Sequence, residues 1–213
     1  MGRLSKGILG GFSGTVGTVI GGTWKGIPYM RSQASGRRAS STVKQKEQRM
    51  KFGLMVRFQG TMTSLLNFTF NGLAVHMTGS NYALRTNLAN AITGTYPDFA
   101  IDYSKISVSK GELPNALNPV ATAAADSIIN FTWADNSGAG KAAETDQSIL
   151  VVYCPERQQT VYINGDYRAD ESSFIDVTMF AGLSVETWIA FMSEEGRSTS
   201  PSIYTGNLTV LPV

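Results

Sequence analysis

Residues 7–32 limit the possible folds of this chain most, because strand-forming side chains are separated there by glycines that have nothing to pack. The glycines stand at positions 14, 17, 21, 22 and 26 among β-branched and aromatic residues. Two short strands around Gly21–Gly22 would form a hairpin, and an isolated two-stranded hairpin is marginal in water. The stretch therefore needs a surface to lie on, which is either the rest of this chain or a neighbouring copy.

A flexible glycine-rich leader is the alternative interpretation of this stretch. Disordered segments are poor in aromatic and β-branched residues, whereas residues 7–32 contain many of them. We therefore interpret the stretch as a β arm that docks on another surface. The expected subunit-interface residues are apolar: Phe12, Val16, Val19, Ile20, Trp24, Ile27 and Tyr29.

The charged residues are divided unevenly along the chain, although the formal net charge is only +2. Residues 1–57 hold eleven Lys and Arg and one acid, Glu47, whereas residues 58–213 hold seven Lys and Arg and fifteen acids. A basic arm on an acidic body predicts contact with nucleic-acid phosphates or with the acidic body of another subunit, and a solvated basic face is the alternative. The candidate contact residues are Arg3, Lys6, Lys25, Arg31, Arg37, Arg38, Lys44, Lys46, Arg49 and Lys51.

The 213 residues allow one or two domains and, at 42% hydrophobic residues, a sizeable core. No uncharged apolar run reaches the length of about 18 residues that a membrane span needs. The apolar residues after Lys6 are broken by glycines, so that no signal peptide forms. We expect synthesis in a cytoplasm.

Few residues in the chain are suited to catalysis or metal binding. The single cysteine, Cys154, excludes an internal disulfide and ends an apolar run, where a buried thiol is expected. The single histidine, His76, has no Cys, Asp or Glu within eight residues. The metal-binding and phosphate-binding motifs are missing, and the paired carboxylates lie in expected turns. We therefore expect a protein that is not an enzyme and has no cofactor or metal.

The pattern predicts three regions: a basic Gly-rich arm and linker (1–41), a helical region (42–97) and a β-sandwich (98–213). Thr42 and Gln45 are spaced as a capping box and predict a helix over 42–59, followed by a break. Its expected apolar face carries Met50, Leu54, Phe58, Met62 and Leu65–Leu66. A second helix is expected, capped by Ser80 or Asn81, with Leu84, Leu88, Ala91 and Ile92 on one face and with Gly94 and Pro97 closing it.

From about residue 100 the apolar period changes from near 3.6 to 2. Seven strands are expected, at residues 101–108, 129–133, 148–154, 159–163, 174–180, 185–192 and 202–211. Turn signals separate them at intervals typical of an antiparallel β-sandwich, so that the predicted fold class is α+β.

Two resemblances add to this pattern. Trp133, Tyr153 and the segment 185–191 make the C-terminal part resemble a fibronectin type III or immunoglobulin-like sandwich, without the cysteine pair of antibody domains. Nearly the whole chain resembles a domain-of-unknown-function family found in Bacteroidota and their phages and prophages. That likeness rests on the segments 10–17, 24–32, 48–52, 94–97, 102–103, 131–138 and 202–206.

Three functions stay open from the sequence. The first is a self-assembling structural subunit, such as a phage capsid, shell or tube protein, whose arm docks on neighbouring subunits. The second is an accessory sandwich module that binds a protein or glycan through loops such as 135–145 and 163–173. The third is a nucleic-acid-binding protein that uses the basic helix at 42–58. We expect a homo-oligomer, and a virion location if the first function holds.

Overall fold

The computed structural model describes residues 2–4, 7, 10–34 and 41–212, and the chain divides into two compact units, Met1–Thr42 and Val43–Val213. The fold class is α+β, as expected, and the sheets are antiparallel.

The first unit is a small antiparallel sheet with the strand order β1-β2-β3-β4. Its strands are β1 (Arg3–Leu4), β2 (Phe12–Val16), β3 (Val19–Trp24) and β4 (Ile27–Ser32). The expected turn at Gly21–Gly22 is wrong, because both glycines lie inside β3. The chain turns instead at Gly17–Thr18 and Lys25–Gly26, where Gly17, Lys25 and Gly26 have φ of 57°, 46° and 83°. Two-residue hairpin turns require such positive φ values.

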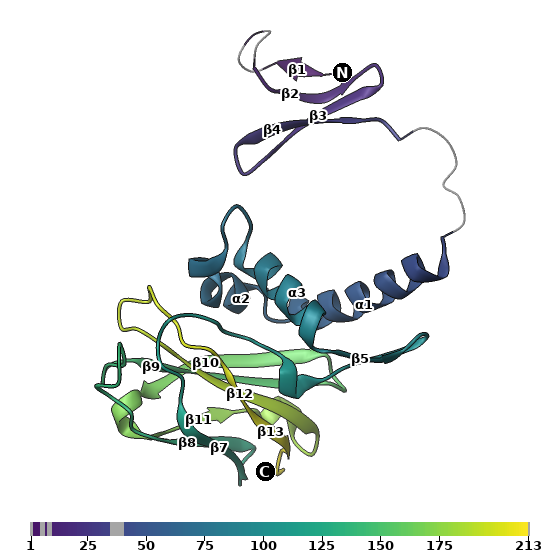
Figure 1. Cartoon of the computed structure of the whole chain (residues 1–213). Coiled ribbons are helices and arrows are strands. Elements are labelled where there is room, and N and C mark those ends of the chain that lie inside the picture. Colours follow the sequence, from purple (N-terminus) through teal and green to yellow (C-terminus); the bar gives the residue numbers. More distant parts are fainter. Residues whose placement is uncertain (1, 5–6, 8–9, 35–40, 213) are drawn as a thin grey trace. The chain divides into compact units, whose positions relative to one another are not determined.

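The second unit has three layers, with helices on one face of a four-stranded sheet and a three-stranded sheet on its other face (Figure 1). The helices are α1 (Val43–Gly60), α2 (Thr63–Thr69) and α3 (Gly79–Asn90). Short 3-10 turns are η1 (Asn71–Leu73), η2 (Tyr103–Lys105), η3 (Arg168–Asp170) and η4 (Thr178–Phe180). A separate hairpin joins β5 (Ile92–Thr95) to β6 (Asp98–Ile101).

The two larger sheets form the β-sandwich. The middle sheet has the order β10-β9-β12-β13 and the outer sheet the order β11-β8-β7. Their strands are β7 (Leu117–Ala124), β8 (Ile128–Ala134), β9 (Gln147–Cys154), β10 (Gln159–Tyr167), β11 (Ser172–Asp176), β12 (Ser184–Met192) and β13 (Ile203–Thr209). When β7 to β13 are taken as strands A, B, C, C′, E, F and G, this order matches that of an immunoglobulin-like sandwich.

The middle sheet is buried on both faces, which explains the unbroken apolar run in β9. Ile149, Val151 and Tyr153 pack with the helices, whereas Leu150 and Val152 pack with the outer sheet. Successive residues of a strand point to opposite faces, so a strand covered on both sides is apolar at every position. The helices and the sandwich therefore share one body.

The helix over 42–59 is confirmed as α1, and the break after it lies at Thr61–Met62. Met50 was wrongly placed on its buried face, because no described residue of α1 before Met55 is buried and Met50 is 42% exposed. Burial begins at Met55 and continues at Phe58. The second helix, α3, is capped by Thr78 and not by Ser80 or Asn81, because the Thr78 hydroxyl accepts a hydrogen bond from the Asn81 N–H.

The strand expected at 101–108 is also wrong, since this segment contains the end of β6, the turn η2 and coil. Asp102 and Lys105 form an i, i+3 ion pair there, with 2.8 Å between Nζ and Oδ2. The first strand of the sandwich is β7, in a segment where the sequence analysis expected no strand. Pro119 is accommodated at a register shift between Leu117 and Val120, where strands admit proline.

Candidate assembly surface

The sheet of the first unit carries apolar side chains on both faces. The β2–β3–β4 register places Val16, Val19 and Met30 on one face, which we call the Met30 face. Trp24, Ile27 and Tyr29 lie on the opposite face, which we call the Trp24 face. All six side chains are exposed, from 37% for Val19 to 72% for Met30. Paired residues share a face and successive residues alternate between faces, which assigns three of these side chains to each face. Each face of the sheet therefore presents apolar side chains to solvent.

Two glycines inside β3 make room for aromatic rings. A Cβ on Gly21 would lie 2.6 Å from the Phe12 ring and 2.3 Å from the Phe12 carbonyl oxygen. A Cβ on Gly22 would lie 2.9 Å from the Tyr29 ring on the other face. Each aromatic ring thus covers the backbone where a side chain is missing, which is the local reason for the glycines in this strand.

The described residues of this sheet form no hydrophobic core. Within the described part of the first unit, Gly21 is the only buried residue. Phe12 and Ile20, two of the expected interface residues, are half-buried, and Val16, Val19, Trp24, Ile27 and Tyr29 are exposed. The sequence analysis missed Met30, although its period-2 spacing from Pro28 places it beside Val19 and Gly21.

The free edge of β4 is poorly suited to strand addition. The Gln33 N–H donates to the Thr18 carbonyl at 2.7 Å. Along an antiparallel pair, residues whose N–H points to the partner strand alternate with residues whose N–H points away from it. This alternation turns position 28 toward the free edge, where Pro28 has no N–H to donate. The faces of this sheet, and not this edge, are the surfaces open to a partner.

The expected basic contact residues fall into separate places. Arg3 and Arg31 are exposed on the Trp24 face, through the pairs Arg3–Ser13 and Ile20–Arg31, and Lys25 lies in the following turn. Lys6, Arg37 and Arg38 lie outside the described residues. Lys44, Lys46 and Arg49 are exposed on α1, while Lys51 is half-buried with its Nζ 4.7 Å from the centre of the Phe99 ring.

The helix α1 also exposes apolar side chains that the sequence analysis did not single out. They are Val43, Phe52 and Val56, besides Met50. A groove beside α1 is lined by Phe52, Leu84 and Leu88 and rimmed by Lys51 and Arg85. This part of the body is therefore basic and apolar together.

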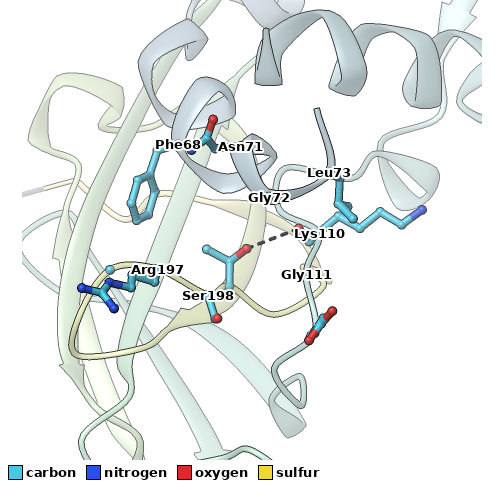
Figure 2. Close-up of a pocket in the computed structure, with 11 residues that line it drawn as sticks. Phe68, Asn71, Gly72, Leu73, Lys110, Gly111, Arg197 and Ser198 are labelled. Atoms are coloured by element: carbon cyan, nitrogen blue, oxygen red, sulfur yellow. Dashed lines mark hydrogen bonds between the residues drawn. The ribbon is translucent and has the colours of Figure 1, made fainter. Parts of the chain in front are cut away.

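A cavity of about 430 Å³ opens between α2–η1, the segment 110–112 and the turn 196–199 (Figure 2). Its two cations do not converge, because the Lys110 and Arg197 side chains point to opposite sides (Figure 2). Arg197 pairs with Glu195 at 3.2 Å, and Glu112 pairs with Lys141. The Lys141 ion pair lowers the pKa of Glu112. The cavity has room for a ligand but no set of groups aimed at one.

The residues considered for chemistry are dispersed. His76 is exposed in a loop with φ of 58°. Cys154 is buried, as expected. Hydrogen bonding and charge attraction from Lys105 lower the pKa of Asp102, which lies on the surface. Among the described residues there is no group of three or more His, Cys, Asp or Glu that could hold a metal. None of the described helices combines the length and the apolar composition of a membrane span.

These features define an α+β protein in which an immunoglobulin-like sandwich carries a helical layer and is joined in sequence to a β sheet without a core. The chain belongs to a family of unknown function, DUF6266, whose model matches residues 11–206. The expected membership of an uncharacterised family is confirmed, and the origin from Bacteroidota or their phages stays a prediction.

A comparison with curated proteins gives no match. Among solved structures, the chain is similar to the fibronectin type III domain of the human collagen alpha-1(XX) chain. The identity is 8% and the TM-score 0.35, over 47% of this chain and 87% of that one. At this score the similarity carries no argument about function.

Proposed function

We propose that this protein is a non-enzymatic, self-assembling structural subunit whose N-terminal sheet docks on a neighbouring subunit. The observation that carries the proposal is the sheet β1–β4, which exposes apolar side chains on both faces and has no core among its described residues. A sheet of this kind gains stability only when another surface covers it, because an isolated hairpin or small sheet is marginal in water. Burial of one large apolar side chain contributes roughly 1.5–3 kcal/mol, so a few such contacts stabilise an interface.

The division of charge supports a contact between unlike regions of two subunits. The first 42 residues contain no acid, and the acids of the chain lie in the body. Contact of this head-to-tail kind generates rings, shells or filaments. In its most specific form, the proposal is a subunit of a phage capsid, shell or tube, made in the cytoplasm of a bacterial host.

The test is the mass of the purified full-length protein by light scattering at low and high salt. We expect an oligomer that loses mass when residues 2–40 are removed, and also when Ile27 and Met30 are both changed to Asp. Changing Val75, which is 68% exposed in a loop of the body, to Asp is the matched control and keeps the full mass. Loss of mass at high salt assigns part of the contact to charge. A full-length monomer under every condition would contradict the proposal.

A nucleic-acid-binding protein is the second candidate, favoured by the exposed cations Lys44, Lys46 and Arg49 on α1. In that case the purified protein retains nucleic acid, and binding falls steeply between low and high salt. Changing the three residues to Glu abolishes this binding and leaves the mass of the protein alone unchanged.

An accessory protein- or glycan-binding module is the third candidate. Arg168 lies in η3, within the second of the two segments proposed for it, and its guanidinium donates to Asn136 in the first. Binding of a glycan or protein by a monomer, lost when Asn136 or Asp166 is changed, would favour this candidate.

A further inference from the structure

The outer face of the three-stranded sheet β11-β8-β7 is not covered by any described element of its unit. Ile129, Phe131 and Ile175 point inward to the core between the sheets. The side chains between them point outward in three rows across the strands. The rows are Ser172–Thr132–Val120, Phe174–Asn130–Thr122 and Asp176–Ile128–Ala124. Phe174 is 58% and Val120 52% exposed, so the face presents large apolar side chains to solvent.

This face is also acidic. The segments 117–134 and 169–180, which build it and its turns, contain four acids and no Lys or Arg. The acids are all exposed: Asp126, Asp170, Glu171 and Asp176. Hydrogen bonds from Thr178 hold the pKa of Asp176 below its ordinary value, so this carboxylate is charged at neutral pH.

The Trp24 face of the N-terminal sheet has the complementary character. It presents Trp24, Ile27 and Tyr29 together with Arg3 and Arg31, whereas the positions on the Met30 face are uncharged. The outer face spans three strands and the Trp24 face four, with five or more residues in the longer ones. Two sheets of similar width pack face to face at a spacing of about 10 Å.

We infer that the acidic outer face of β7, β8 and β11 binds the Trp24 face of the N-terminal sheet from a second copy of this chain. This inference rests on the proposed function and names the acceptor surface for it. Trp24 and Tyr29 pack against Phe174 and Val120, and the two arginines lie among the four carboxylates. Electrostatic complementarity of this kind fixes the partner and the orientation more than it adds affinity.

We take the occupant from a second copy, because the proposed function needs a contact between subunits and because docking within one chain would require a longer path from α1 to the outer face. The ten residues 33–42 between β4 and α1 span at most about 35 Å when extended. α1 packs on the opposite side of the middle sheet, two layers of about 10 Å each away, and the outer face looks away from it. A chain of this length would also have to pass around the edge of the sandwich.

The first test is a charge reversal at the acceptor in the full-length chain. The double variant Phe174→Lys and Asp176→Lys changes two exposed side chains, and we expect the mass by light scattering to fall at least twofold. The control variant carries Val75→Lys and Glu194→Lys, which are also exposed and alter the charge equally, and it keeps the mass. Circular dichroism is used to check that both variants are folded.

The second test is cross-linking of a mixture of ¹⁴N-labelled and ¹⁵N-labelled full-length protein with a carbodiimide, which joins Lys to Asp or Glu. We expect linked peptides that pair Lys25 with residues 170–176 and carry one light and one heavy partner. Linked peptides of a single isotope only would show a contact within one chain and would overturn the inference.

The outcomes separate this inference from the proposed function. If removal of residues 2–40 abolishes assembly but the Phe174 and Asp176 variant retains it, the acceptor is wrong and the proposed function stands. If the full-length chain is a monomer at every salt concentration, both fail.

Discussion

At the scale of single residues, the guanidinium of Arg168 is the most constrained group in the body. It is fully buried and lies 3.1 Å from Asp146 Oδ2, and it donates to the Pro114 carbonyl at 3.0 Å. The Cζ atom of Arg168 lies 3.9 Å from the centre of the Phe191 ring. Burial lowers the pKa of Arg168, and the charge of Asp146 opposes this shift. The network connects segments far apart in sequence, so its function is to hold the loops at one end of the sandwich.

Removing one partner of this buried pair leaves an uncompensated charge. We expect Arg168→Met to lower the free energy of unfolding by about 3–5 kcal/mol, measured by urea denaturation. Arg197→Met is the control, because its side chain is 83% exposed and a surface change shifts stability by about 0.5 kcal/mol or less. A smaller loss in the double variant Arg168→Met and Asp146→Leu than in the single one would identify the unpaired charge as the cause.

Two tyrosines of the body give a second prediction at this scale. Burial raises the pKa of Tyr103 and of Tyr204, and the hydrogen bond from the Tyr204 hydroxyl to Glu186 adds to the second shift. Above about pH 10 an unfolded tyrosine loses its proton while these two keep theirs. The unfolded state then binds fewer protons, so the free energy of unfolding falls as pH rises.

The measurement is urea denaturation at pH 8 and pH 11. The variant Tyr103→Phe and Tyr204→Phe should lose less stability between these pH values than the unaltered chain does. Tyr162→Phe, a change at a partly exposed site, should leave the difference as it was. An equal loss in all three proteins would contradict the role of the buried phenols.

At the scale of elements, α1 and β3 show why sequence patterns succeed or fail. Capping signals and a helical period are local, so they located α1 within a residue. The buried stripe of α1 depends on where the helix leaves the body, which no local pattern encodes, and Met50 was therefore misassigned. Similarly, Gly21 and Gly22 suggested a turn, because their partners Phe12 and Tyr29 become neighbours only in the folded sheet.

Substitution of two glycines separates these roles. Gly21→Ala should disrupt the pairing of β2 with β3, because its Cβ has no room, and should speed amide hydrogen exchange in both strands. Gly53→Ala in α1 has nothing within 4 Å of its Cβ and should stabilise the helix by up to about 1 kcal/mol. Hydrogen exchange mass spectrometry reads both changes, and protected β2 and β3 amides in Gly21→Ala would contradict the first.

At the scale of the whole molecule, the sequence predicted the fold class and the antiparallel sandwich, because period 2 and frequent turns are strong signals. It missed β7, since this strand contains Asn118 and Pro119, two residue types that are depleted in strands. It described the helices and the sandwich as separate regions, although Met55 and Phe58 share a core with Tyr153 and Trp188. Strand-forming apolar residues among glycines are visible in the sequence, so the exposed apolar side chains of the N-terminal sheet could be named, and their role at an interface stays a prediction. The outer face of β7, β8 and β11 could not be named, because it depends on strand pairing.

The shared core leads to a prediction about cooperativity. We expect residues 43–213 to unfold in one transition, so that helix content by circular dichroism and Trp fluorescence change together in urea. Met55→Ala, at a fully buried helix position, should lower the midpoint of both signals equally and cost about 2–5 kcal/mol. Loss of helix before the fluorescence change would show that the helical layer folds separately.

The double burial of the middle sheet has a practical consequence for recombinant protein. A shortened chain that starts at residue 98 would retain every strand of the sandwich. It would, however, expose Val151, Trp188 and Ala190 to water as one continuous apolar surface. Such a surface promotes precipitation. A shortened version of this chain therefore has to begin before α1, so that the helices continue to cover this face of the middle sheet.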